Sequence, residues 1–130
     1  MVTDSEVCEQ VIFCGSRDQD WLARVAPCVS VVVSPSTGRA LGEAALGGAP
    51  VVAYDIDWHS ELIVGGETGE LVAHRDAVAM ADAIERLLAD PDRARRLGRA
   101  LRAKAMAMLD PALGKRMQAA TYDALLAKRR

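Results

Sequence analysis

The residue types best suited to chemistry are concentrated in one short stretch, residues 34–43. It carries the hydroxyls of Ser36 and Thr37, the guanidinium of Arg39 and the carboxylate of Glu43, arranged around Gly38. A guanidinium is a planar donor that can bind a phosphate group through two hydrogen bonds. Glycine allows the backbone to approach a ligand closely. The stretch therefore has the composition of an anion-binding loop.

The patterns on either side of this stretch predict that it follows a strand. Residues 29–33 are an apolar, β-branched run, which predicts a buried strand. Residues 40–46 predict a short helix that Ser36 and Thr37 can cap, and two glycines followed by Pro50 predict its end and the start of the next strand. A helix N-terminus at the carboxyl end of a parallel strand is where open α/β sheets bind ligands, and its N–H groups and dipole favour phosphate.

A second candidate cluster is His59 with Asp55 and Asp57, in the loop expected after the strand at residues 50–54. A histidine beside carboxylates is a candidate general base. We favour the alternative, a loop histidine near the mouth of the site with no catalytic duty. Two loop acids without His or Cys partners are a weak metal signal, so no metal site is expected.

Several enzyme classes are excluded because their signatures are missing from the sequence. Neither Ser34 nor Ser36 lies in a G-x-S-x-G nucleophile elbow, and there is no G-x-G-x-x-G or G-x-x-x-x-G-K-[ST] motif. A hydrolase nucleophile, a dinucleotide fingerprint and a P-loop are therefore not expected. Aromatic residues make up only 4% of the chain, which argues against a base-stacking platform and a nucleic-acid partner.

Apolar runs alternate with helical patterns along the first 90 residues. The runs at residues 11–14, 29–34, 50–54 and 71–73 predict strands. Asp18 and Asp76 are the expected N-cap residues of two helices. This alternation predicts an α/β fold, a Rossmann-like parallel sheet of about four strands with helices on both faces. A short helix is expected over residues 60–64. The helix after Asp76 is expected to face the core with Val78, Ala81, Ile84, Leu87 and Leu88.

Two further helices are predicted at the C-terminal end. Asp90 and Asp110 are each followed by proline, the pattern of an N-cap with proline at the first helical position. The helices should cover about residues 91–109 and 111–128, with no strand between them. We expect one domain over residues 1–130, with a Rossmann-like part at about residues 10–90 and a helical appendage at about residues 91–130. Met106, Met108 and Met117 are expected to be core residues of that appendage.

Charge is distributed unevenly along the chain. Residues 1–90 hold 5 Lys or Arg against 15 Asp or Glu, and residues 91–130 hold 11 against 3. A solvated helix face explains the basic end most simply, and a peripheral contact with a membrane surface or an acidic partner is the alternative. Three cysteines without C-x-x-C spacing, with Cys14 expected in the core, indicate a reducing compartment. No transmembrane run or signal peptide is expected, so we expect a cytoplasmic protein, with membrane association at the inner face as an option.

An ordered set of motifs resembles the C-terminal half of family 4 (group 1) glycosyltransferases. It begins with Val-Ile-Phe-Cys-Gly at residues 11–15 and continues through Pro35 to Pro50, with Glu-Ala-Ala at residues 43–45 and Pro-Val-Val at residues 50–52. Glu-Leu-Ile at residues 61–63, Gly-Glu-Thr-Gly-Glu-Leu-Val at residues 66–72, and Leu-Leu-Ala-Asp-Pro with Arg-Leu-Gly at residues 87–98 follow in the family's order. The resemblance implies half of a GT-B fold, which holds a nucleotide-sugar donor such as a UDP- or GDP-sugar as substrate and uses no further cofactor.

The resemblance also implies roles for individual residues. Glu43 matches the second of two family glutamates and would accept hydrogen bonds from the ribose hydroxyls, although a local pair with Arg39 is its structural alternative. The first family glutamate corresponds to Pro35, so the usual contact to the donor sugar is missing here, and Ser36, Thr37 or Arg39 would have to replace it. The implied donor-binding set is Gly15 and Ser16 near the base, Thr37, Gly38, Arg39 and Ala40 at the pyrophosphate, Ser36 near the donor sugar, and Glu43 at the ribose.

The family's first strand and helix and its acceptor-binding domain have no counterpart in this sequence. We therefore expect the chain to be inactive without an N-terminal half, which a separate domain or subunit would supply. An open sheet edge would also permit a homodimer. Two alternatives remain: a nucleotide-sugar 2-epimerase-like domain, which usually carries acidic residues and a glycine pair before this helix, and a non-catalytic pairing or regulatory half-domain.

Overall fold

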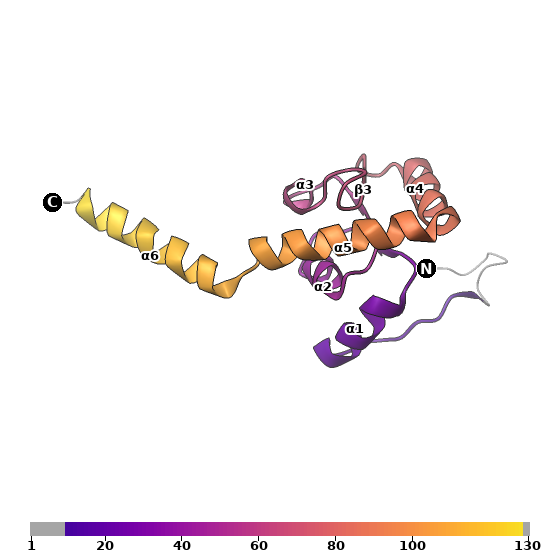
Figure 1. Ribbon diagram of the computed structural model, residues 1–130, viewed down its shortest axis with the longest axis horizontal. Helices are drawn as coiled ribbons and strands as arrows, with labels where there is room; N and C mark the ends of the chain where they lie inside the picture. The colour runs from indigo at the N-terminus through magenta and orange to yellow at the C-terminus, as the bar shows by residue number, and fades with distance from the viewer. Residues whose placement is uncertain (1–9, 129–130) are drawn as a thin grey trace.

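The computed structural model describes residues 10–128 (Figure 1). Within this range three strands and six α-helices alternate in the order of an α/β protein, and the last three elements are consecutive helices. The elements are α1 (Gln19–Val25), the 3-10 helix η2 (Ala26–Cys28), β1 (Val32–Ser34), α2 (Ala40–Gly47), β2 (Val51–Tyr54), α3 (His59–Leu62), β3 (Glu70–Val72), α4 (Ala77–Ala89), α5 (Pro91–Met108) and α6 (Pro111–Ala127).

The strands form one parallel sheet in the order β1-β2-β3. Val32 is in register with Val51, and Val52 is in register with Glu70. The central strand β2 is an apolar run because both of its faces are covered, and Val51, Val52 and Ala53 are fully buried. The α/β prediction is confirmed.

Helices cover both faces of the sheet, and each face has its own hydrophobic cluster. On one face, residues of α2, α3 and the second half of α5 pack against Val51 and Ala53. On the other face, α4 and the first half of α5 pack against Val52 and Val72. The alternation of side chains along β2 explains this division, since Val52 points away from the face that its two neighbours occupy.

The α5 helix joins the two faces. Ala94 and Leu97 belong to the α4 cluster, whereas Leu101 and Ala105 belong to the α2 cluster. Gly98 permits a close approach, because a Cβ atom at this position would lie 2.3 Å from the carbonyl oxygen of Gly48. The division of the domain near residue 90 stays a prediction, but α5 contributes to the packed core.

At its start α5 also contacts the amino end of the sheet. Arg93 donates a hydrogen bond of 2.5 Å to the buried carboxylate of Glu70, the first residue of β3. Arg86 of α4 lies 3.7 Å from the other oxygen of the same carboxylate. Together with Gly98 against Gly48, these contacts hold α5 at the end of the sheet at which β2 and β3 begin.

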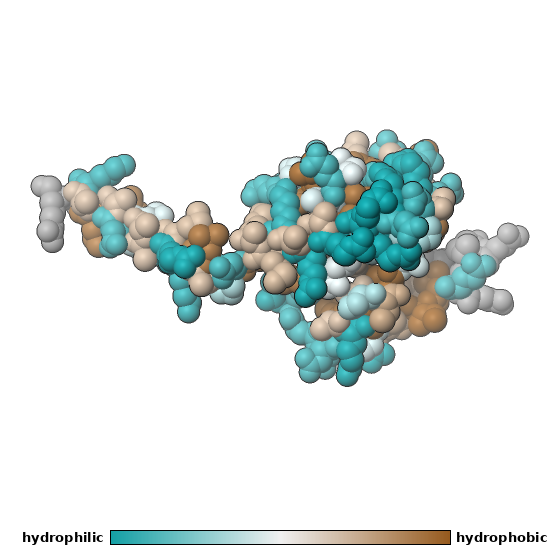
Figure 2. Space-filling model, viewed as in Figure 1, coloured by the Kyte–Doolittle hydropathy of each residue, from teal (hydrophilic) through white to brown (hydrophobic). Residues whose placement is uncertain are grey.

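The α6 helix extends away from the rest of the molecule (Figure 1) and contains no buried residue. Figure 2 shows hydrophobic residues exposed along this arm. Met117 is 63% exposed, and Met106 and Met108 at the end of α5 are exposed as well. The prediction that these methionines are core residues is wrong, because α5 turns its Ala and Leu side chains to the core and α6 meets no second layer.

The helix starts follow the sequence closely. The carboxylates of Asp18, Asp76, Asp90 and Asp110 each accept a hydrogen bond from a backbone N–H in the first turn of the helix that follows. Gly48 ends α2 in the left-handed conformation with φ of 76°. These signals are local, so the sequence predicts them well.

The first predicted strand is wrong. Residues 11–14 form no strand, and all four are exposed, including Cys14, which was expected in the core. A strand needs a neighbour to pair with, and this run finds none among residues 10–128, where the sheet has three strands rather than about four.

The core-facing stripe of α4 is partly wrong. Val78 and Leu88 are 72% and 52% exposed, whereas Met80, Ala83 and Leu87 are buried. The apolar positions of this helix extend around more than one face, so periodicity alone does not decide which of them meets the sheet. No helix within residues 10–128 has the length and apolar character needed to cross a membrane.

Candidate functional site

The three strands run in the same direction, so their carboxyl ends lie at one edge of the sheet. The loops that leave this edge are residues 35–39 after β1, 55–58 after β2 and 73–76 after β3. At the opposite end, α5 packs against Glu70 and Gly48. The carboxyl edge is therefore where this fold can receive a ligand.

The first turn of α2 begins next to the end of β1. Arg39 is its N-cap residue, and no side chain of residues 10–128 makes a capping hydrogen bond there. The prediction that Ser36 or Thr37 caps this helix is wrong, because both are exposed and the helix starts three residues later than Thr37. The uncapped N–H groups of the first turn are available to an anion.

Gly38 immediately precedes this helix start and has a φ of +146°, a conformation that side chains with a Cβ rarely adopt. No atom lies within 4 Å of the place where its Cβ would be. The space above the loop is open, and Ser36, Thr37, Gly38, Arg39 and Ala40 are all exposed.

Glu43 lies in the first turn of α2 and is half-buried. Its Oε1 accepts a hydrogen bond of 2.7 Å from the side-chain amide of Gln19, the first residue of α1. In the part of the chain that the structure describes, Glu43 makes no ion pair with Arg39. The carboxylate is held by a neighbouring helix rather than by a partner on its own helix.

The bond between Gln19 and Glu43 places the start of α1 beside the start of α2. Gly15 and Ser16 lie in the exposed loop before α1, and Gly15 has a φ of +67°. Asp18 caps α1 by accepting from the N–H of Trp21 at 2.8 Å. The structure thus brings the loops before α1 and α2 to neighbouring positions.

His59 differs from its prediction. It is fully buried and opens α3 instead of lying in a loop. Its Nδ1 is 2.9 Å from the carbonyl oxygen of Tyr54, and its ring packs edge-on against Trp58. The Nε2 atom has no hydrogen-bond partner. In this structure the His59 side chain lies inside the core and is not exposed at the surface.

Asp55 and Asp57 are exposed at the end of β2, and Asp57 has a φ of 51°. No group of three or more His, Cys, Asp or Glu side chains in residues 10–128 has an arrangement that could hold a metal ion.

Sequence reasoning missed His74 and Arg75, which follow β3 and are exposed at the same edge. Arg75 has a φ of 65°. The described chain has two non-glycine residues with positive φ, Asp57 and Arg75, and both lie in loops at this edge of the sheet. Backbone outliers of this kind are often found at functional sites. The sequence did offer a signal for His74 and Arg75, since both come immediately after the strand expected at residues 71–73.

Residues 2–90 match the family described as "Glycosyl transferases group 1". The chain belongs to this family. It corresponds to part of the C-terminal domain of the family's GT-B fold. The resemblance predicted from the motifs is confirmed.

Individual members of the family show how much of the domain is shared. A D-inositol 3-phosphate glycosyltransferase of Nocardia farcinica is 36% identical over 96 residues, which are 71% of this chain and 21% of that protein. A glycogen synthase of Mycobacterium tuberculosis is 34% identical over 94 residues, which are 69% of this chain and 23% of that protein. This group 1 glycosyltransferase chain thus spans about a fifth of the length of the relatives it matches.

A solved structure agrees with the fold. The sucrose-phosphate synthase from Thermosynechococcus elongatus superposes with a TM-score of 0.84 at 33% sequence identity, over 94% of this chain and 32% of that chain. The agreement covers the sheet and the helices that position the carboxyl edge.

Proposed function

We propose that this glycosyltransferase chain is the part that binds the donor nucleotide, in an enzyme that moves a sugar from a nucleotide-sugar to an acceptor. Membership of the group 1 family supports the reaction class. The observation that carries the proposal is the uncapped N-terminus of α2, which follows Gly38 at the carboxyl edge of a parallel sheet. This arrangement suits a pyrophosphate.

The first role of the site is to hold the pyrophosphate. The backbone N–H groups near Thr37, Gly38 and Ala40 donate to phosphate oxygens, and the helix dipole favours the negative charge. Arg39, exposed at the N-cap, adds a bidentate donor. When the glycosidic bond to the donor breaks, negative charge grows on the departing nucleoside diphosphate. Fixed donors at that position stabilise the transition state.

The second role is to orient the nucleoside. Glu43 accepts one hydrogen bond from Gln19 and retains acceptor capacity on both carboxylate oxygens. Two ribose hydroxyls are donors that match this capacity. Gly15 and Ser16, in the loop next to this position, then lie near the base.

The donor sugar lacks the usual carboxylate contact, because Pro35 has no polar side-chain atom. Ser36, Thr37 or Arg39 supplies the replacement contact in this proposal. The acceptor is bound by an N-terminal domain or subunit that is not part of this sequence, so transfer requires that second half. The proposed reaction takes place in the cytoplasm, with at most a peripheral contact to a membrane.

Nucleotide titration followed by calorimetry and by NMR tests the proposal, with UDP and GDP as the two probes. We expect one of them to bind with chemical-shift changes at residues 15–16 and 37–43. Glu43→Gln should weaken binding about tenfold, because a charge-assisted hydrogen bond to ribose contributes roughly 1.5–3 kcal/mol. The better nucleotide identifies the base.

The matched control is Glu85→Gln, which removes the same charge from an exposed position on α4. It should leave the affinity unchanged. Absence of binding by both nucleotides, or equal losses in the two variants, would overturn the proposal.

A further inference from the structure

Gln19 and Glu43 make the contact that joins α1 to the candidate site. The Nε2 atom of Gln19 donates a hydrogen bond of 2.7 Å to Oε1 of Glu43, across 24 positions of the sequence. Side chains of a helix lean toward its N-terminus, so the Glu43 carboxylate is directed toward the start of α2 and the carboxyl edge of the sheet. The amide of Gln19 therefore reaches the proposed ribose ligand itself.

The position of Gln19 is set by α1. Gln19 is the first residue of this helix and follows its cap, Asp18, whose carboxylate accepts a hydrogen bond of 2.8 Å from a backbone N–H of the first turn. Further along the helix, Leu22 and Val25 lie with residues of α2 around an apolar cavity of about 150 Å³. The amide donor thus belongs to a capped helix that packs on α2, although the Gln19 side chain is exposed.

The hydrogen bond leaves Glu43 able to serve as a ligand. A carboxylate has about four acceptor positions, and Gln19 occupies one of them. Because the carboxylate is planar, a bond that holds Oε1 also restricts the direction of Oε2. An amide donor is neutral, so it orients the carboxylate without cancelling its negative charge, as a Lys or Arg at this position would. The oriented oxygens therefore remain strong acceptors for two hydroxyl groups.

From these observations we infer that Gln19 is a positioning residue of the donor site, which orients Glu43 so that both carboxylate oxygens meet the ribose hydroxyls. The inference rests on the proposed function, since it takes Glu43 as the ribose ligand. A glutamate that is oriented in advance loses less conformational freedom when the nucleotide binds. Gln19 thus sets how strongly the site prefers a ribose nucleotide to a deoxyribose nucleotide, without contacting the nucleotide.

The test compares two ligands by calorimetry with the full chain, namely the better-binding nucleotide of UDP and GDP and its 2′,3′-dideoxy counterpart. The dideoxy ligand lacks the hydroxyls that donate to Glu43. We expect the wild-type chain to bind the ribose nucleotide about tenfold more tightly or better. Gln19→Ala should lower this preference roughly threefold to tenfold, because an unheld glutamate must be ordered on binding. The affinity for the dideoxy ligand should stay the same.

Two further variants sharpen the comparison. Gln19→Glu keeps the length of the side chain but replaces the amide donor with an acceptor, so it should reduce the preference at least as much as Gln19→Ala. Gln118→Ala is the matched control, because it removes the same amide from an exposed position on α6. This control should leave both affinities unchanged.

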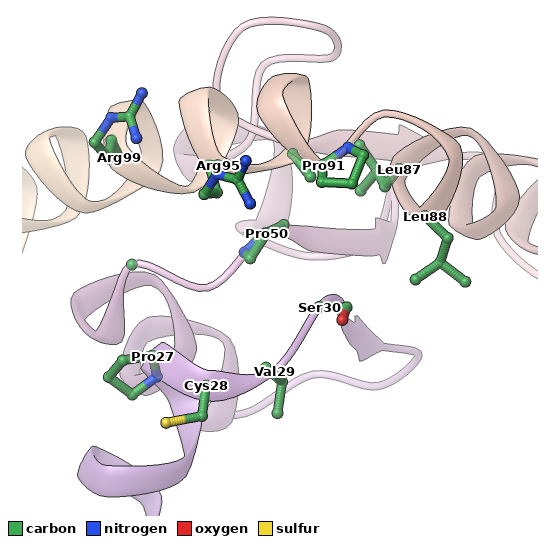
Figure 3. A pocket seen from close by; sticks show the side chains of 12 residues that line it. Pro27, Cys28, Val29, Ser30, Pro50, Leu87, Leu88, Pro91, Arg95 and Arg99 are labelled. Atoms are coloured by element: carbon green, nitrogen blue, oxygen red, sulfur yellow. The ribbon is translucent and has the colours of Figure 1, made fainter.

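A separate hollow provides a control for binding elsewhere on the molecule. A cavity of about 430 Å³ lies ahead of β1, and Arg95 and Arg99 of α5 are among the residues that line it (Figure 3). Phosphates held by these arginines would be insensitive to residue 19. Arg99→Gln should leave both affinities unchanged. Loss of binding in Arg99→Gln would move the nucleotide to this cavity and overturn the inference together with the proposed site.

The two ligands separate failure of the inference from failure of the proposed function. If Gln19→Ala weakens both ligands equally, Gln19 only tethers α1 to α2, and the inference is wrong while the proposed function stands. A preference that is unchanged in either Gln19 variant has the same meaning. A wild-type chain that binds neither nucleotide, or that binds the ribose and dideoxy ligands alike, would overturn the proposed function and the inference with it.

Discussion

Glu70 shows most clearly how single residues hold this fold. It is a carboxylate at the start of β3, almost fully buried, and it contacts arginines from two different helices. A buried charge is tolerated only when it is paired and hydrogen-bonded. Arg93 provides that pairing and so fixes the start of α5 against the amino end of the sheet.

Replacing Glu70 with Gln should destabilise the protein by about 1–3 kcal/mol, because the arginine of a part-buried pair loses its partner. The cost is below that of a fully buried pair, since the Arg93 side chain is 28% exposed. Chemical denaturation measures the change. Asp92→Asn breaks the exposed pair with Arg95 and should cost less than about 1 kcal/mol. Equal effects of the two substitutions would rule out a structural role for Glu70.

At the scale of elements, the helices divide into those that share the core and one that does not. The α5 helix contributes five buried residues, whereas α6 contributes none. Most helical stability in proteins comes from tertiary packing of one face rather than from the helix propensity of the sequence. The two helices therefore have different stabilities although their caps are alike.

Hydrogen exchange followed by mass spectrometry should separate them. We expect the amides of α6 to exchange much faster than those of the buried stretch of α5, since local opening of α6 exposes no buried residue of that helix. Similar protection of both helices would show that a contact covers α6 in solution.

The elements also show which features a sequence can predict. Asp76, Asp90 and Asp110 cap the helices as expected, because a cap involves only residues within one turn. Strand pairing depends on distant residues, so the strand predicted at residues 11–14 failed although its composition was right. His59 was expected in a loop and is buried, with its Nδ1 2.9 Å from the carbonyl oxygen of Tyr54 and its ring edge-on to Trp58.

For the candidate site, too, the sequence predicted the local features and not the contacts between distant residues. The order of strand, glycine loop and helix located the region of Gly38 and Glu43, and the geometry agrees with it. The contact of Glu43 with Gln19 links residues 24 positions apart and left no local trace in the sequence. The roles of the individual donor-binding residues stay predictions.

At the scale of the whole molecule, the two ends of the sheet have separate tasks. The carboxyl edge carries the candidate binding residues, whereas Glu70, Arg93 and Gly98 hold α5 against the amino end. Substitutions at the amino end of the sheet should change the stability of the protein without changing its affinity for the nucleotide.

Gly98→Ala tests this separation. An added Cβ would overlap the carbonyl oxygen of Gly48, and overpacking of this kind costs about 1–3 kcal/mol. Gly98 lies at the end of the sheet away from the candidate site. The affinity of the folded protein for its nucleotide should therefore change less than about twofold, which corresponds to well under 1 kcal/mol. Denaturation and calorimetry on the same variant give the two values.

The control is Gly114→Ala on α6, where no atom lies within 4 Å of the added Cβ. This substitution should leave stability unchanged or raise it slightly, since alanine is a better helix former than glycine. A Gly98→Ala variant as stable as Gly114→Ala would contradict the close packing of α5 on the loop before β2.

The position of α5 also has a consequence for synthesis on the ribosome. Leu101 and Ala105 complete the cluster on one face of the sheet, and Ala94 and Leu97 complete the other. A nascent chain that has emerged only as far as residue 90 contains all three strands, but it lacks the α5 residues that complete the hydrophobic cluster on each face of the sheet. We therefore expect the nascent domain to remain protease-sensitive until α5 leaves the exit tunnel, and then to fold in one cooperative step.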